Sequence, residues 1–386
     1  MSAQIAPVYL DHNATTPPVA EAVAEMLEVL QRVWGNPSST HAVGQAARRC
    51  LADARLRVAA FLDCQSSELV FTSGATEANH LALRGLLPAA GPRRRLLLSA
   101  VEHPGLLALG RALAQQGVPV DLIPVDSQGR LDMDAARALI GDDVMLLSVM
   151  GANNETGVLM PTHQLAELAH AHGALLHVDA TQLAGKSALS FAHSGADLMS
   201  VSAHKFGGPK GVGALLVRKG LTLAPLLSGR QERQRRGGTE NLPGIAGFAA
   251  ACARIGATLA EDIARMRGLR LRLERGLLHA LPEVHVYGQQ AERLPNTLCL
   301  RFGTLPAEQV LVRLERPGVI AASGAACSAG GTQPSHVLLA MGECDAMAKG
   351  GVRFSLGAAT TAEDIERTLA AAQRALAPLL AGPVLA

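Results

Sequence analysis

Aromatic side chains are scarce in this sequence, since Phe, Trp and Tyr together make up 3% of its 386 residues. A surface that stacks nucleic-acid bases needs several exposed rings, so this composition argues against one. An excess of one charge is lacking too. The formal net charge at pH 7 is +2, which gives no overall field to attract nucleic acid or an anionic membrane. We therefore expect neither nucleic acid nor membrane among the partners.

Long uncharged apolar runs and paired cysteines are also missing. No window offers the roughly 20 uncharged apolar residues of a membrane-spanning helix, and the nearest, Gly244–Ala260, carries Arg254. The start of the chain lacks the basic and apolar regions of a signal peptide. The six cysteines form no CxxC pair and match no zinc or disulfide spacing, so we expect free thiols, no metal site and a cytoplasmic location.

Apolar residues, in contrast, are abundant. They make up 48% of the chain, against 18% charged residues, which is enough to bury a large core. The length suggests two domains. Between residues 68 and 218, short continuous apolar runs alternate with segments of helical spacing, which is typical of a mostly parallel sheet covered by helices on both faces. Seven runs are strand candidates: ELVFTS, RLLLSA, VPVDLIPV, VMLLSVM, ALLHVDA, DLMSVSA and VGALLVR.

The pattern changes after about Gly256. A helix from about Leu259 to Leu281 precedes weaker strand candidates, and the TAED segment at Thr361 is typical of a capping box that begins the last helix. We therefore predict an α/β fold in two domains. A large domain over 16–256 would hold the mostly parallel seven-stranded sheet, and 1–15 together with 257–386 would form a smaller α+β domain.

Ligands of such sheets bind beyond the carboxyl ends of the strands, so the residues that follow each run are the candidates for a site. The first run, ELVFTS, ends in the segment FTSGATEAN. A tight Ser-Gly turn and a helix that begins near Ala75 would offer backbone N–H groups and the Thr76 hydroxyl to a phosphate. Taken alone, a strand–helix turn without a ligand is the alternative. The other polar residues at this edge are His103, Asn154, Asp179, Gln182, Ser202, His204 and Lys205.

Lysine is rare in this chain and occurs only at Lys186, Lys205, Lys210, Lys219 and Lys349. Where arginine fills most basic positions, a lysine at a strand edge indicates a need for an amine, which a guanidinium cannot supply. Lys205 is the best candidate. A phosphate cradle, a carboxylate and a reactive lysine together suit pyridoxal phosphate (PLP), with Asp179 on the ring nitrogen and Lys205 on the aldehyde carbon.

A cysteine surrounded by small residues stands out near the end of the chain. Cys327 lies in AASGAACSAGG, where almost no side chain would pin the backbone. One interpretation is a small buried residue in a packing turn. The other is a thiol that reacts at one place and delivers its product at another.

These motifs occur in an order that resembles the cysteine desulfurases of the NifS/IscS type, in the class-V aminotransferase group of fold-type I PLP enzymes. The resemblance runs through essentially the whole chain. It rests on the segments YLDHNATTP, GNPSSTH, FTSGATEAN, EHP, NNETG, HVDATQ, SAHKFGGPKGVG, RRGGTENLPGIAGF, SGAACSAG and VRFSLG.

The resemblance implies a role for each matching residue. Lys205 would carry PLP, His103 would stack on its ring and move protons, and Cys327 would be the sulfur acceptor. Arg353 would bind the substrate carboxylate, and Asn36 would lie near the site. Thr239 would complete the phosphate site of a partner subunit, which implies a homodimer. The cofactor-binding set is Ala75, Thr76, Asn154, Asp179, Gln182, Ser202, His204, Lys205 and Thr239.

The implied reaction removes sulfur from L-cysteine, releases L-alanine and leaves a persulfide on Cys327 for an iron–sulfur scaffold or another sulfur-acceptor protein. Rival hypotheses are a selenocysteine lyase, another enzyme of the class-V aminotransferase type, and a non-catalytic scaffold that kept the fold. Nucleotide binding through GGPKGVG is rejected, because the segment lacks the GxxxxGK[ST] order of a P-loop.

Overall fold

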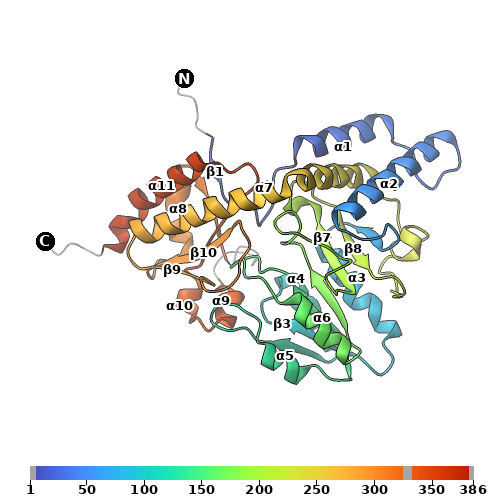
Figure 1. Ribbon diagram of the computed structural model, residues 1–386, viewed down its shortest axis with the longest axis horizontal. Helices are drawn as coiled ribbons and strands as arrows, with labels where there is room; N and C mark the ends of the chain where they lie inside the picture. Colours follow the sequence, from blue (N-terminus) through green and yellow to red (C-terminus); the bar gives the residue numbers. More distant parts are fainter. Residues whose placement is uncertain (1–5, 325–332, 382–386) are drawn as a thin grey trace.

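The computed structural model describes residues 6–324 and 333–381. A sheet of seven strands forms the centre of the larger lobe, as the apolar runs predict (Figure 1). In spatial order the strands are β2 (Leu69–Thr72), β8 (Gly213–Val217), β7 (Leu198–Ser202), β6 (Leu175–Asp179), β5 (Val144–Met150), β3 (Arg95–Ser99) and β4 (Val120–Ile123). The five strands β7, β6, β5, β3 and β4 are parallel to their neighbours within this group, whereas β8 runs antiparallel to both β2 and β7.

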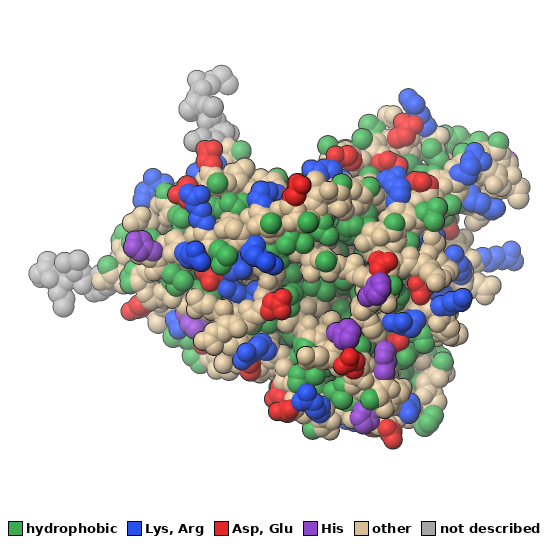
Figure 2. Space-filling view, in the orientation of Figure 1, with side chains coloured by type: hydrophobic (Ala, Val, Ile, Leu, Met, Phe, Trp, Pro, Cys, Tyr) green, Lys and Arg blue, Asp and Glu red, His purple; other side chains and the backbone are tan. Residues whose placement is uncertain are grey.

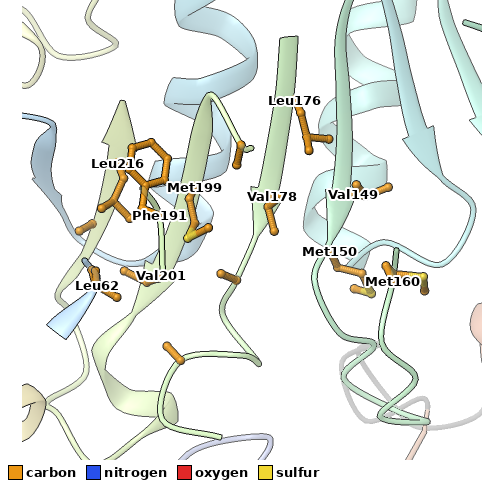
Figure 3. Packing of buried hydrophobic residues seen from close by; sticks show 14 of the residues in the cluster. Leu62, Val149, Met150, Met160, Leu176, Val178, Phe191, Met199, Val201 and Leu216 are labelled. Atoms are coloured by element: carbon orange, nitrogen blue, oxygen red, sulfur yellow. The ribbon is translucent and has the colours of Figure 1, made fainter. Parts of the chain in front are cut away.

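Helices cover both faces of this sheet. One face packs against α3 (Ala75–Leu86) and α4 (Pro104–Gln115). The other packs against α2 (Ala42–Phe61), α5 (Met133–Leu139), α6 (Thr162–Ala171) and the first part of α7 (Leu242–Ala280). Because both faces are buried, the central strands are mostly apolar, and Figure 3 shows Val178, Met199 and Leu216 from neighbouring strands packed in one layer.

The smaller lobe has its own core around a second sheet. Its strands, in spatial order, are β12 (Ala322–Ser323), β13 (Val352–Ser355), β10 (Thr297–Phe302) and β9 (Val284–Val286). Strand β1 (Val8–Tyr9) pairs in parallel with β11 (Val319–Ile320), so the start of the chain belongs to this lobe. The remaining helices here are α8 (Ala307–Glu315), α9 (His336–Ala340), α10 (Asp345–Ala348) and α11 (Ala362–Leu380), and Thr361 with Asp364 forms the predicted capping box of α11.

Helix α7 joins the two lobes and spans 39 residues (Figure 1). It begins 17 residues before the predicted start at Leu259, so the predicted domain boundary at 256 falls inside it. By length and composition it is the one described helix that could cross a membrane. However, 61% of its most apolar window is buried inside the protein, as in a core helix.

The remaining helix, α1 (Ala20–Arg32), lies against α7 near the top of the view in Figure 1. Short 3₁₀ turns occur at Leu87–Ala89, Ala203–Lys205 and Glu232–Gln234. Basic and acidic side chains are interspersed over the face shown in Figure 2. This distribution agrees with a formal net charge of +2, and neither sign dominates the visible surface.

Candidate active site

A cavity of about 480 Å³ opens at the carboxyl ends of the parallel strands. Its walls come from the turns that follow β2, β3, β5, β6 and β7, together with the start of the chain and strand β13 of the smaller lobe. Ten predicted site residues line it: Ala75, Thr76, His103, Asn154, Asp179, Gln182, Ser202, His204, Lys205 and Arg353.

One end of the cavity is formed by the amino end of helix α3. Ala75 and Thr76 are its first residues, and the first N–H groups of an α-helix have no acceptor within the helix. Ser202 and His204 face the same space from the end of β7. Burial and the nearby Lys205 lower the pKa of His204 to about 4, so this ring is neutral at pH 7. Oriented N–H groups beside hydroxyls and a neutral imidazole form a site for an anion such as a phosphate.

Asp179 is the last residue of β6, in the centre of the sheet. Its Oδ2 accepts a hydrogen bond of 2.8 Å from Asn79 Nδ2, and its Oδ1 accepts one of 3.0 Å from the Thr181 backbone N–H. The carboxylate is only 6% exposed and is therefore held in one orientation. The Thr181 hydroxyl oxygen also lines this space and, within the described residues, is buried without a hydrogen-bond partner. A buried hydroxyl without a partner is expected where the polar groups of a ligand would bind.

Lys205 lies in the 3₁₀ turn that directly follows β7. Its Nζ donates hydrogen bonds to the backbone oxygens of Asn13, at 2.7 Å, and Ala14, at 3.0 Å. The segment that holds the amine therefore comes from the start of the chain. Lys205 lines the main cavity and also a second, mostly apolar cavity of about 230 Å³.

His103 is the N-cap of helix α4, where its Nδ1 accepts a hydrogen bond of 3.1 Å from the Gly105 backbone N–H. Burial lowers the pKa of the imidazole, and the charges of Lys205 and His336 add to this effect, whereas Asp179 opposes it. The ring is thus neutral at pH 7. Because the capping bond uses Nδ1, the proton of this neutral ring lies on Nε2, the nitrogen left for a ligand.

Arg353 enters the cavity from β13 of the smaller lobe and is 2% exposed. Its Nη2 pairs with Asp11 Oδ1 at 2.6 Å, and its Nη1 donates to the Asn154 backbone oxygen at 3.0 Å. The guanidinium therefore closes the cavity with its planar fork already oriented. It is the one charged group that the smaller lobe's sheet brings to this cavity among the described residues.

Two predicted site residues that the structure describes do not line the cavity. Thr239 and Asn36 are both exposed and do not line it, and the Asn36 side chain instead accepts a hydrogen bond from the Ser38 backbone N–H. The prediction that Asn36 lies near the site is thus not met within a single chain. Thr239 was expected to act on a partner subunit. Cys327 lies outside the described residues.

The residues that flank segment 325–332 meet at Glu155. The Ser335 hydroxyl donates to Glu155 Oε2 at 2.5 Å, and a Cβ on Gly324 would lie 2.4 Å from the same oxygen and 3.6 Å from the Ser335 Cβ. Glu155 directly follows Asn154, a cavity residue. Both flanks of the segment that contains Cys327 therefore lie next to the cavity wall, and Ser335 is bonded to it.

The sequence analysis missed four residues that shape the site. Asn79 orients Asp179, Asn13 accepts from Lys205, Asp11 pairs with Arg353, and Lys186 donates to Gln182. Asn79, Asp11 and Asn13 lie inside motifs already singled out, FTSGATEAN and YLDHNATTP. The rarity of lysine was the only available signal for Lys186.

The fold and the cavity define a fold-type I PLP-dependent enzyme. A family model described as "Aminotransferase class-V" matches residues 8–368. The chain is 47% identical to a cysteine desulfurase of Cereibacter sphaeroides over 94% of both proteins. It is also 47% identical to one of Rhodobacter capsulatus, over 98% of this chain and 99% of the relative. The chain belongs to the class-V aminotransferase family, within the cysteine desulfurases of the NifS type.

Solved structures agree with this assignment. A NifS-like protein superposes with a TM-score of 0.89 at 34% identity, covering 95% of this chain and 98% of that one. The protein SspA, solved in complex with cysteine, gives a TM-score of 0.80 at 28% identity, covering 92% and 99%. The predicted fold class is thereby confirmed.

Proposed function

We propose that this chain is a PLP-dependent enzyme that takes sulfur from L-cysteine, releases L-alanine and holds the sulfur as a persulfide on Cys327. The observation that carries the proposal is the single cavity that contains Lys205, Asp179 and the amino end of α3. The position of both flanks of the Cys327 segment against Glu155, next to this cavity, adds to it.

The described residues fit PLP at each of its polar groups. The amino end of α3, with Ser202 and His204, would hold the phosphate, and Asp179 would pair with the ring nitrogen. Gln182 would face the ring oxygen, and Lys205 would hold the aldehyde carbon. When bound, PLP supplies an electron-withdrawing ring that stabilises negative charge at the substrate Cα.

Residues of the chain itself would bind the substrate, transfer protons and accept the sulfur. Arg353 would bind the substrate carboxylate through its oriented fork, and the freed amine of Lys205 would move protons at the substrate Cα. Burial keeps His103 neutral at pH 7, so its ring can take up a proton once Nδ1 is released from the Gly105 N–H. Cys327 would form an S–S bond to the substrate sulfur while the C–S bond breaks. The electron pair stays on carbon, which is protonated to give alanine.

We further propose that the protein is a homodimer. Thr239 is exposed in its own chain, as suits a residue that reaches a partner's phosphate site. Helix α1, together with the second residue beyond its end, exposes a stripe of large apolar side chains at helical spacing: Val23, Leu27, Leu30 and Trp34. Such a stripe on a surface helix is typical of an interface. An iron–sulfur scaffold or another cytoplasmic protein is the proposed sulfur acceptor.

A Cys327→Ala variant tests the sulfur acceptor directly. We expect it to lose alanine and sulfide formation from L-cysteine while it keeps the visible absorbance of bound PLP. Unchanged turnover would refute the assigned role of Cys327. A Lys205→Ala variant should lose the visible band of the lysine-bound cofactor. Comparing selenocysteine with cysteine as substrate separates a lyase specific for selenium from the proposed activity.

A further inference from the structure

Gln182 lines the cavity, and its side-chain amide is held from two sides. Its Nε2 donates to the Asn13 backbone oxygen at 3.0 Å, and its Oε1 accepts from Lys186 Nζ at 2.5 Å. A backbone carbonyl can only accept, so the amide nitrogen must face Asn13 and the oxygen must face Lys186. The NH₂ group has a second hydrogen, which has no acceptor among the described residues.

Lys186 is an unusual residue to bury. Its side chain is 4% exposed, and in the described part of the chain it has no carboxylate within ion-pair distance. Burial lowers the pKa of its amine well below the usual value, and the positive charges of Lys205 and Arg353 lower it further. An amine desolvated in this way contributes little to stability, and an apolar side chain of similar length would suit the same space better. The amine therefore needs a different explanation from packing.

The local backbone brings Lys186 to this place. After β6 the chain forms helix-like turns in which Lys186 N–H donates to the Leu183 oxygen. Gly185 has a φ of +75°, and a Cβ there would lie 2.4 Å from the Phe206 Cβ. A glycine is thus required for the turn to pack against the residue next to Lys205. As a result Lys186 lies one turn after Gln182 and points its amine back at the amide oxygen.

We propose that Lys186 is a positioning residue. By holding the oxygen of the Gln182 amide, it keeps the second amide N–H directed into the cavity, where it would donate to the ring oxygen of PLP. This inference rests on the proposed function, because that oxygen belongs to PLP. A hydrogen bond to an ionised oxygen favours the ionised form, so the Gln182 N–H would keep the bound chromophore deprotonated at lower pH.

The test is a double-mutant cycle of Lys186→Met and Gln182→Ala on the PLP-loaded protein. The readouts are the midpoint of the pH titration of the visible absorbance and the PLP dissociation constant. We expect each single variant to raise the midpoint by about one pH unit and to weaken PLP binding about tenfold, the effect of one hydrogen bond to a charged group. The double variant should shift no further than Gln182→Ala alone.

Two results would overturn the proposal. One is a Lys186→Met variant with an unchanged midpoint. The other is a Lys186→Met shift that persists in full in the Gln182→Ala background, because the amine would then act through its charge and not through the amide. The exposed Lys219→Met is the matched control and should change neither readout. If the unmodified protein binds no PLP, the proposed function fails instead, which is a distinguishable outcome.

Folding of each variant is checked by thermal melting of the apoprotein. Lys186→Gln is a second, smaller and neutral variant at this position, too short to span the same distance to the amide. It must show the same non-additivity with Gln182→Ala, and full additivity in this pair would also overturn the inference.

Discussion

Asn79 donates its side-chain amide to Asp179 Oδ2 at 2.8 Å and so joins helix α3 to the end of strand β6. The same helix offers its amino end to the cavity. One side chain therefore fixes the spacing between the amino end of α3 and the Asp179 carboxylate, the groups proposed to hold the phosphate and the ring nitrogen of PLP.

We expect Asn79→Ala to weaken PLP binding at least tenfold, because a hydrogen bond to a charged group contributes about 1.5–3 kcal/mol. Titration of the apoprotein with PLP, followed by visible absorbance, measures this. Arg84→Ala is the control on the same helix, since its side chain bonds Gln116 and not the cavity. Equal affinity of Asn79→Ala and the unmodified protein would contradict the prediction.

Arg353→Lys should raise the KM for L-cysteine about tenfold or more and leave the visible absorbance of bound PLP intact. A lysine carries one donor group and cannot reproduce the fork that reaches Asp11 and the Asn154 oxygen together. Steady-state kinetics of alanine formation give the value. The exposed Arg316→Lys serves as the control, and an Arg353→Lys variant with the KM of the unmodified protein would show that this fork does not bind substrate.

The pH dependence of kcat/KM should reflect the lowered pKa of His103. Because burial disfavours the charged ring, the neutral form persists below the ordinary histidine value of about 6.5. The rate is therefore expected to fall on the acid side only below that pH. His103→Gln should reduce kcat by about 10²–10⁴-fold, the usual loss for a proton-transfer group. A variant with full activity would remove His103 from the reaction.

Glu155 should make the free energy of unfolding depend on pH. Burial raises its pKa from 4.5 to about 7. A raised pKa in the folded state means that its stabilising contribution is complete below pH 4.5 and is lost as the pH rises through 7. Between pH 5 and pH 8 the unmodified protein should lose about 2–3 kcal/mol relative to Glu155→Gln. Urea unfolding of both proteins at the two pH values measures the difference, and parallel pH profiles would count against a raised pKa.

The strands of the large sheet could be predicted because most of them are short apolar runs buried on both faces, and only the edge strand β4 among the described strands of this sheet exposes two of its residues. The edge of the sheet then identified the candidate residues, and Asp179 and Lys205 both proved to line one cavity. The prediction succeeded because the sequence places polar residues just after each apolar run, and the fold brings the ends of the parallel strands together at one edge of the sheet.

The contacts that hold these residues in place could not be predicted. Asn13 bonds Thr297 across 284 positions and accepts from Gln182 across 169, and no local pattern encodes such pairs. The predicted start of helix α7, at about Leu259, was wrong for a related reason. Gly247 looks unfavourable for a helix interior, yet a Cβ there would lie 2.6 Å from Met26 Cγ, so the glycine permits α1 to approach. Tertiary packing outweighs helix propensity at this position.

Helix α7, at 1.5 Å per residue, is a continuous rod about 58 Å long that is embedded in both hydrophobic cores. A displacement of one lobe relative to the other would require helix α7 to bend. Since Arg353 belongs to the smaller lobe and Asp179 to the larger one, the stiffness of α7 helps to set the distance between these two charged groups, although the helix itself does not line the cavity.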